Sequence, residues 1–555
     1  MAIEGFTPYP LELVREYTEK GYWQGLTVGD LLVRTAERFP NRIALVDEKE
    51  KTTYGELAER VDRLALGLLG IGIKREDRVI IQLPNWAEFV YIYLAMARIG
   101  AVSVMALPHH RVREIGHMLR LTESVAYVGP MAYRNFDYFE MIRKLQPDMS
   151  HLRHIIAAGE KPPPGALSLN ELLEKEPLGP YRREDLSRLG PGPNDVSVLL
   201  WTGGTTAEPK GVAHTHNAHL CFANYFSRIY PRSSETSFLV SPPIAHNAAL
   251  SVGLNSALIY GEKLVLITGT GPEEILQTIE RERISATFLV PTQAIAVINL
   301  PDLARFDLSS LKVVLCGAAH VPPELVRNIR SKLDCEVTNG YGMTEGLANA
   351  TRVGDPLEVT CETVGRPICP GDEYRVVNEE GQVLPPGQEG ELIARGPCIF
   401  RGYYKAAEYN RNAFNAEGFF FTGDLATFDH QGNLRITGRK KDMILRGGEN
   451  ISAEEIEELL ITHPQVEEAA VVGMPDERLG ERVCAYLRTR PGQTVTLEEA
   501  VSFLREQGIA SFKFPERVEL INEFPLTPVG KVSKKTLRER ITREIDEERG
   551  MGAKG

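Results

Sequence analysis

Strand-like and helix-like patterns alternate along the first hundred residues. Residues 78–83 form an apolar run that predicts a buried strand, residues 84–98 follow helical spacing, and residues 101–107 are apolar again. Thr53 and Glu56 have the spacing of a capping box at the start of an earlier helical pattern. Strand, helix and strand at this spacing predict a parallel sheet that is covered by helices.

The pattern changes between the middle and the end of the chain. Strand and helix patterns alternate again at residues 236–300, whereas residues 161–193 are rich in proline and glycine and predict a connecting loop region. From about residue 365, turn residues separate short alternating runs, which is typical of antiparallel strands. We therefore expect an α/β protein. Its large N-terminal domain (residues 1–440) has helix-covered sheets and a β-rich subdomain, and its small C-terminal domain (residues 441–555) is α+β.

Composition narrows the classes of function. The 555 residues carry a net charge of −12, which argues against nucleic-acid and anionic-membrane partners. No apolar stretch reaches the ~18 residues that would span a bilayer, and the first residues lack the apolar core of a signal peptide. The seven cysteines include no C-x-x-C pair, so their spacing indicates neither a disulfide framework nor a zinc site. We expect a cytoplasmic protein.

A glycine- and threonine-rich segment after the strand pattern at residues 195–200 has the chemistry of a phosphate-binding loop. Its glycines let the backbone fold around an anion, its threonines add hydroxyl donors, and its lysine adds a mobile positive charge. The residue order is not that of a Walker A loop. The predicted phosphate-binding residues are Thr202, Gly203, Gly204, Thr205, Thr206 and Lys210.

Five motifs along the chain occur in the order and spacing of a known superfamily. The glycine- and threonine-rich segment, then residues 339–346 (NGYGMTEG), 422–425 (TGDL), 438–450 (GRKKDMILRGGEN) and 528–531 (PVGK) resemble the adenylate-forming superfamily of acyl-CoA synthetases, luciferases and peptide-synthetase adenylation domains. The opening GFTPYP and GYWQG, the pair His246-Asn247 and residues 505–519 resemble stand-alone aryl-acid AMP ligases. Those enzymes load salicylate or 2,3-dihydroxybenzoate for siderophore assembly.

The resemblance implies a two-step reaction that uses ATP and Mg²⁺. A carboxylate attacks the α-phosphate of ATP and releases pyrophosphate, and the acyl group then passes to a phosphopantetheine thiol. Because both reactants of the first step are anions, the site must supply positive charge. By resemblance, Lys531 is the catalytic residue, assisted by Lys210, and Lys441 is the hinge of a mobile C-terminal domain. Gly447 and Gly448 would then line the thiol channel.

The resemblance also assigns residues to the ATP and metal sites. Glu345 would hold Mg²⁺ together with Thr205 or Thr206, Asp424 would bind the ribose hydroxyls, and Tyr341 would stack on adenine. Asp424 as a plain turn residue and Tyr341 as a core residue are the alternatives. The full set expected at ATP comprises Thr202, Gly203, Gly204, Thr205, Thr206, Lys210, Gly317, Ala318, Asn339, Gly340, Tyr341, Gly342, Thr344, Asp424, Ile436, Arg439 and Lys531.

The predicted acid pocket departs from the aryl-acid pattern. Ala248 replaces the usual tyrosine after the asparagine, Val252 stands where a serine would align, and Thr344 replaces the common alanine of the second motif. Since Val252 cannot bond a 3-hydroxyl, we expect a monohydroxy or unsubstituted aryl acid. His246 and Asn247 could instead be ordinary loop or cap residues. The expected pocket residues are His246, Asn247, Val252, Cys316, Gly317 and Gly342.

Several functions remain open at this stage. The acceptor is a carrier-protein phosphopantetheine arm or free CoA, and the second choice would make the protein an aryl- or acyl-CoA ligase. An ATP hydrolase or kinase would use the same loop but would release ADP. A non-catalytic nucleotide-binding protein is disfavoured because Glu345, Asp424, Arg439 and Lys531 are all present. We expect a monomer or a homodimer.

Overall fold

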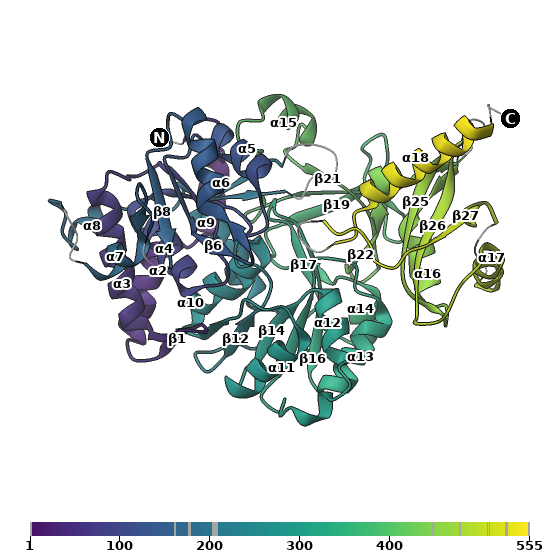
Figure 1. The fold of residues 1–555 in the computed structure, drawn as a ribbon, viewed down its shortest axis with the longest axis horizontal. Coiled ribbons are helices and arrows are strands. Elements are labelled where there is room, and N and C mark those ends of the chain that lie inside the picture. Colours follow the sequence, from purple (N-terminus) through teal and green to yellow (C-terminus); the bar gives the residue numbers. More distant parts are fainter. Residues whose placement is uncertain are drawn as a thin grey trace. The chain divides into compact units, whose positions relative to one another are not determined.

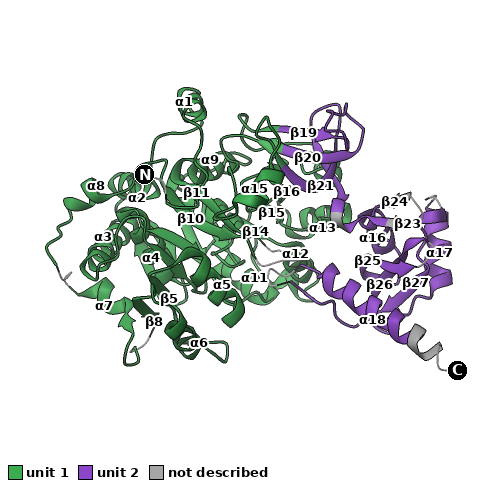
Figure 2. Cartoon of the chain, turned by 90° about the horizontal axis from the view of Figure 1, so that it is seen from above, with its two compact units in different colours: residues 1–202, 208–373, 394–420 green, residues 203–207, 374–393, 421–555 purple. Residues whose placement is uncertain are grey.

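The computed structural model divides into two compact units (Figures 1 and 2). Unit 1 comprises residues 1–202, 208–373 and 394–420, and unit 2 comprises residues 203–207, 374–393 and 421–555. Each unit is described here by itself. The structure describes residues 3–159, 162–175, 179–202, 209–446, 449–476, 479–507, 509, 511–527 and 531–552.

Unit 1 contains two large sheets. In the first, the central strands run parallel and their carboxyl ends meet at one edge, which positions the residues that follow those strands. Its order is β18 (Arg366–Pro367), β17 (Ala348–Ala350), β16 (Glu336–Gly342), β15 (Val313–Gly317), β14 (Ala286–Leu289), β12 (Ser237–Val240), β13 (Lys263–Leu266), β1 (Ile43–Val46) and β2 (Lys51–Thr53).

The second sheet of unit 1 is also mostly parallel. At one edge, β11 forms an antiparallel hairpin with β10, in which Trp201 lies opposite Gly211. The hairpin brings the two ends of the predicted phosphate-binding loop together. The order is β11 (Gly211–Thr215), β10 (Val196–Trp201), β4 (Val102–Met105), β3 (Arg78–Ile81), β5 (Ala126–Pro130), β8 (His154–Ala158) and β9 (Leu167–Ser168).

Helices pack around these sheets (Figure 1). The capping box predicted from the sequence is present, because the Thr53 hydroxyl accepts from the backbone amide of Glu56 and the Glu56 carboxylate accepts from the amide of Thr53. The main helices of unit 1 are α1 (Leu11–Glu19), α2 (Val28–Arg38), α3 (Tyr54–Gly70), α4 (Ala87–Ile99), α5 (Val112–Thr122), α6 (Tyr138–Leu145), α9 (His216–Phe226), α10 (Ser256–Tyr260), α11 (Pro272–Arg281), α12 (Pro291–Ile298), α13 (Pro323–Leu333), α14 (Leu357–Glu362) and α15 (Ala407–Ala413).

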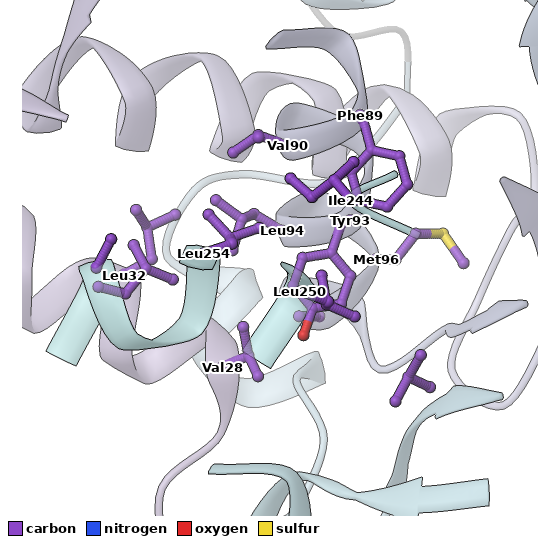
Figure 3. Packing of buried hydrophobic residues seen from close by; sticks show 14 of the residues in the cluster. Val28, Leu32, Phe89, Val90, Tyr93, Leu94, Met96, Ile244, Leu250 and Leu254 are labelled. Carbon is purple, nitrogen blue, oxygen red and sulfur yellow. The ribbon is translucent and has the colours of Figure 1, made fainter. Parts of the chain in front are cut away.

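Helix α4 is buried on nearly all sides, which an amphipathic surface helix would not be. Figure 3 shows its residues Phe89 and Tyr93 among side chains of α2 and of the segment at residues 244–254. Gly100 ends the helix in the left-handed conformation (φ 72°), which costs glycine no strain. The core of unit 1 therefore forms around α4 and reaches the segment that carries the predicted acid pocket.

Unit 2 is built from two smaller sheets. A four-stranded sheet, which lies largely in this unit, has the order β19 (Glu373–Val377), β20 (Gly390–Arg395), β21 (Phe420–Phe428) and β22 (Leu434–Arg439). A second sheet comprises β23 (Ile444–Arg446), β24 (Glu449–Ile451), β25 (Val466–Asp476), β26 (Gly480–Thr489) and β27 (Arg517–Leu520). Helices α16 (Ala453–Ile461), α17 (Leu497–Glu506) and α18 (Lys534–Gly552) accompany it.

The α/β class and the mainly antiparallel character of the later sheets are confirmed. The loop predicted over residues 161–193 is wrong in part, since α7 (Leu169–Glu174) and α8 (Asp185–Leu189) lie within it. Ser168 caps α7 by accepting from the amide of Glu171, and Leu169 and Leu173 are buried. Burial of these leucines stabilises a helix that composition alone disfavours. The boundary near residue 440 stays a prediction.

Among the described residues, no helix combines the length and the apolar character that crossing a bilayer would require.

Candidate functional site

Most of the predicted acid and adenine residues lie at one edge of the large sheet in unit 1. Strands β12, β14, β15 and β16 run parallel, so the segments that follow them emerge on the same side. Asn247 follows β12, Gly317 ends β15, and Tyr341 lies near the end of β16. Ligands of open α/β sheets bind at this carboxyl edge. Topology thus brings together residues that are almost a hundred positions apart.

Glycine is required where β15 and β16 meet. Gly317 lies opposite Gly340, and a Cβ atom built on Gly317 would stand 2.3 Å from the carbonyl oxygen of Gly340. The next residue, Ala318, is left-handed at φ 68°, a conformation that non-glycine residues rarely adopt. Such strained backbone is common at ligand sites. The two glycines leave this part of the edge flat, as a planar base requires.

Asn339 has a structural role in addition to its predicted one. Its side-chain amide donates to the carbonyl oxygens of Thr360 (3.3 Å) and Thr363 (3.1 Å), and its backbone amide donates to the Thr351 hydroxyl. These bonds tie β16 to the segment around α14. Asn339 therefore positions Tyr341, which is half-buried two residues later on the same strand.

Glu345 is held in a buried position. Its carboxylate accepts from the hydroxyl of Tyr403 at 2.6 Å, and its carbonyl accepts from the amide of Phe400 at 2.9 Å. Burial and the neighbouring Glu345 carboxylate raise the pKa of Tyr403, so this phenol stays a donor. Next to it, Gly346 is at φ 98°, and a Cβ there would lie 2.0 Å from the carbonyl of Cys398. Both Glu345 and its loop are thus held by residues 398–403, which follow β20.

The predicted phosphate-binding loop is described only at its two ends. The amide of Thr202 donates to the carbonyl of Lys210 at 3.1 Å, and the amide of Lys210 donates to the Thr202 hydroxyl at 3.3 Å. Gly203, Gly204, Thr205 and Thr206 lie outside the described residues. The Lys210 ammonium lies 3.5 Å from the centre of the Tyr409 ring, a cation–π contact. Hydrogen bonds therefore join the two ends of the loop, and the Lys210 ammonium contacts an aromatic ring.

Asn247 belongs to a buried chain of hydrogen bonds that the sequence did not reveal. The Ser251 hydroxyl donates to the Asn247 side-chain oxygen at 2.9 Å and lies 2.8 Å from Nε2 of His219. Burial and the nearby His214 and His216 lower the pKa of His219 well below its usual value, so the imidazole is neutral. Because the hydroxyl donates to Asn247, the neutral ring donates from Nε2 to Ser251. This chain fixes the orientation of the Asn247 amide.

The remaining acid-pocket residues differ in exposure. Val252 (1% exposed) and Cys316 (1% exposed) are buried, whereas His246 is only partly buried. Burial raises the pKa of the Cys316 thiol to about 12, so it stays protonated. The sequence analysis did not identify Ser251, because the serine of the aryl-acid pattern was aligned with the neighbouring residue Val252. The helical spacing from Asn247 to Ser251, four residues, was the available signal.

His214 and His216 are separated by one residue, and their imidazoles bond to different partners. His214 Nε2 lies 2.7 Å from the carbonyl of Thr344, and His216 Nδ1 accepts from the amide of Val28. Burial lowers the pKa of both imidazoles to about 4. His214 therefore links β11 to the loop that carries Glu345, through the Thr344 carbonyl.

In unit 2, the structure brings Asp424 and Arg439 together. They lie opposite each other on the antiparallel pair β21 and β22, and the Arg439 Nε is 2.9 Å from the Asp424 carboxylate. Asp424 is buried and its amide donates to the Thr422 hydroxyl at 3.0 Å, whereas the Arg439 side chain is 44% exposed. Ile436 is half-buried three residues before Arg439. The strand pair therefore presents a carboxylate and a cation at one place.

Lys531 lies close enough to this pair to interact with both charges. Its pKa is lowered to about 8, first by partial loss of solvation and then by the Arg439 charge, while Asp424 acts in the opposite direction. The residue as a whole is exposed. The segment is anchored because the Thr527 amide donates to the Lys531 carbonyl and the Lys531 amide donates to the Thr527 hydroxyl at 3.1 Å.

The predicted hinge is only partly described. Lys441 lies in a single turn of 3₁₀-helix, Lys440–Asp442, and its side chain is outside the described residues, as are Gly447 and Gly448. On either side of it, the Ser452 hydroxyl donates to the carbonyl of Thr437 at 2.9 Å, and Asp442 pairs with Arg538 of α18 at 2.6 Å. The predicted hinge residue thus lies between two anchored neighbours.

Comparison with known proteins places these observations in context. A family model described as AMP-binding enzyme matches residues 32–404, and one described as AMP-binding enzyme C-terminal domain matches residues 455–531. The 2,3-dihydroxybenzoate-AMP ligase of Bacillus subtilis is 39% identical over 544 residues, which are 98% of this chain and 99% of that protein. A Mycobacterium tuberculosis protein described as salicyl-AMP ligase / salicyl-S-ArCP synthetase is 36% identical over 540 residues, 96% of this chain and 94% of the relative.

A solved structure agrees with these relatives. The apo structure of MbtA from Mycobacterium smegmatis matches with a TM-score of 0.73 and 36% identity, over 96% of this chain and 98% of that one. The similarity extends over both units and not over a single shared subdomain.

Proposed function

This chain belongs to the AMP-binding enzyme family, and from that premise we propose that it activates an aryl carboxylic acid as its acyl-adenylate. ATP supplies the AMP and pyrophosphate leaves. The acyl group then passes to the phosphopantetheine thiol of a carrier protein. The names of the relatives from Bacillus subtilis and Mycobacterium tuberculosis support both the aryl acid and the AMP chemistry.

The observation that carries the proposal is the group formed by Asp424, Arg439 and Lys531. A buried carboxylate is suited to accept hydrogen bonds from two neighbouring ribose hydroxyls. Arg439 and Lys531 supply two cations beside it. Charge of this kind stabilises the transition state in which two anions join. Lys531 is then the catalytic residue, because its ammonium would contact the reacting oxygens.

Unit 1 carries most of the other residues that are expected to bind ATP. The flat edge at Gly317 and Gly340 suits adenine, Tyr341 would cover the base, and Lys210 would bind the phosphates. Glu345 fits a Mg²⁺ ligand because a carboxylate is a hard oxygen donor, and Tyr403 holds it in place. Thr205 is proposed as its partner from the motif alone. Mg²⁺ supplies charge neutralisation at the phosphates when it is bound.

The acid pocket would use Asn247 as a donor. Its side-chain oxygen already accepts from Ser251, so the amide NH₂ is the group that faces a substrate hydroxyl. Val252 offers no hydrogen bond at the neighbouring position. This combination favours an aryl acid with one hydroxyl ortho to the carboxylate, as in salicylate, over a 2,3-dihydroxy acid.

The second step requires the C-terminal part of the chain to move. We place the domain boundary at residues 440 and 441, with Lys441 as the hinge and Gly447 and Gly448 in the thiol channel. Such closure and rotation steps let one site carry out two reactions. The hinge position next to anchored Asp442 supports this division.

An acid-dependent pyrophosphate-exchange screen tests the first step. We expect exchange with salicylate to exceed exchange with benzoate, 2,3-dihydroxybenzoate and short fatty acids. An ATPase or kinase would release ADP with no acid-dependent exchange, and that result would overturn the proposal. Exchange that is fastest with 2,3-dihydroxybenzoate would overturn the assigned pocket but not the reaction.

The acceptor is tested separately. Salicyl-AMP generated by the enzyme is offered either a holo aryl carrier protein or free CoA, and thioester formation is followed by mass spectrometry. We expect the carrier to be loaded faster at equal thiol concentration. Faster transfer to CoA would make the protein an aryl-CoA ligase.

A further inference from the structure

Three cysteines that are distant in the sequence meet inside unit 1. Cys221 lies on α9, Cys369 follows β18, and Cys398 follows β20. Their sulfur atoms all lie within 4.8 Å of one another, with 3.4 Å between Cys398 and Cys221 and 4.0 Å between Cys221 and Cys369. All three are at most 2% exposed. The remaining four cysteines lie outside this group.

The sulfur spacing suits a thiolate-bound cation. Zinc–sulfur bonds of about 2.3 Å in a tetrahedral site put neighbouring sulfurs about 3.8 Å apart. The two measured separations, 3.4 Å and 4.0 Å, lie on either side of this value. Soft sulfur ligands select zinc over the hard cations that ATP uses. Three thiols that merely filled a core would not need to converge on one point.

A buried carboxyl group stands beside the sulfurs. The Cys398 amide donates to one Asp372 oxygen at 3.1 Å, and the other oxygen, Oδ2, is buried and has no hydrogen-bond partner within the described part of the chain. An unsatisfied buried polar atom is rare and calls for a partner. A water bound to a cation at the three sulfurs would provide one.

The three sulfurs are buried, so charge on them needs a compensating partner. A divalent cation would offset the charge of all three thiolates, which burial otherwise disfavours.

A cavity borders one member of the group. It has a volume of about 210 Å³ and is lined by Cys221 together with Tyr22, Arg34, Leu220 and Asn224. The surroundings of Cys221 therefore include polar side chains.

We propose that Cys221, Cys369 and Cys398 bind one Zn²⁺ ion as thiolates, with water in the fourth position and the Asp372 Oδ2 accepting a hydrogen bond from that water. Each thiol that binds the ion releases its proton to solvent. The site is structural, because it joins α9 to the segments after β18 and β20. The last segment also holds the Glu345 loop through Phe400 and through the close packing of Gly346 on Cys398.

Metal analysis of the full-length protein tests the proposal. The protein is produced with zinc and purified without a metal-affinity step, and zinc is measured by mass spectrometry against protein concentration. We expect about one zinc per chain in the wild type and in Cys335→Ala, a buried cysteine outside the group. We expect strong loss in Cys398→Ser. Equal zinc in Cys398→Ser and wild type, or none in the wild type, would overturn the site.

Three further measurements need no cysteine variant. Cd²⁺ added to metal-free wild type should give the ultraviolet thiolate-to-metal charge-transfer band, and zinc should protect three thiols from a labelling reagent. Asp372→Asn should weaken zinc binding by about 10–100-fold while leaving the band in place. Absence of the band, or a disulfide between Cys221 and Cys398 under the same reducing conditions, would contradict the proposal. None of these readouts requires adenylation activity.

Discussion

The predicted acid pocket and the predicted catalytic lysine are built in opposite ways. Asn247 lies in a buried chain of hydrogen bonds with Ser251 and His219. Lys531 is exposed and is anchored by two bonds to Thr527. The groups that would recognise the acid are fixed by the core, whereas the proposed hinge would let the group that acts on it leave. An enzyme with two reactions at one site needs this division, because only the second group must move between steps.

Removal of the Lys531 charge should have the largest effect on this contrast. Lys531→Ala should lower the rate of acyl-adenylate formation by about 10²–10³, since a charge that stabilises the transition state is lost. Pyrophosphate exchange at saturating ATP and acid measures the effect. Lys535→Ala is the matched control, because Lys535 is an exposed helix lysine paired only weakly with Glu539. Adenylation at full speed in Lys531→Ala would remove the proposed site.

The hinge can be tested without touching that charge. Lys441→Pro restricts the backbone turn at Lys440–Asp442. It should leave pyrophosphate exchange nearly intact and slow thioester formation by about 10²-fold, since misplaced reactants lose rates of this size. Single-turnover transfer from preformed acyl-AMP measures the second step. Equal loss in both steps would contradict the hinge.

The pH dependence tests whether Lys531 acts through its charge. Its pKa is lowered to about 8, so the ammonium loses its proton as the pH rises through that value. Adenylation should then fall about tenfold per pH unit above pH 8. Lys531→Arg keeps its charge, so its residual activity should stay level over the same range. A wild-type profile that is flat to pH 10 would exclude the charged form as the active one.

The fixed side of the comparison is tested at the sheet edge. Gly317→Ala places a Cβ against the Gly340 carbonyl and should destabilise the protein by about 1–3 kcal/mol. The KM for ATP should rise as β15 and β16 separate. Gly192→Ala, where the nearest atom to the new Cβ is an Asp195 carboxylate oxygen at 3.9 Å, should change neither quantity appreciably. Thermal unfolding and ATP titration of the two variants distinguish the cases.

The smallest effect is expected inside the acid pocket. Ser251→Ala leaves Asn247 and His219 without their shared partner and should lower kcat/KM for a 2-hydroxy aryl acid by about tenfold, which corresponds to about 1.4 kcal/mol. Benzoate, which has no hydroxyl to orient, should lose much less. A uniform loss with both acids would mean that Ser251 only stabilises the fold.

The sequence predicted those elements whose cause is local. The capping box at Thr53 and the strand patterns of β3 and β4 follow from neighbouring residues, and all are present. It failed at α7, where burial of Leu169 and Leu173 against the rest of the chain outweighs a loop-like composition. Tertiary packing is invisible to a pattern within one segment.

The candidate site residues were predicted for a different reason. Asp424, Arg439 and Glu345 stand in motifs that resemble those of a known superfamily, and the structure pairs Asp424 with Arg439. Their roles stay predictions. The Ser251 bond to Asn247 and the three-cysteine group follow from no motif. Cys221 and Cys398 are separated by 177 positions. No spacing rule could connect them before the chain was folded.

Contacts across Lys441 join β22 to α16. They include the Ser452–Thr437 hydrogen bond and the exposed Arg435–Glu458 pair. Interactions of these kinds each contribute about 1 kcal/mol or less. Rotation about the proposed hinge would break both contacts at a cost of about 2 kcal/mol or less, which the modest preference of a bound ligand for one orientation would offset.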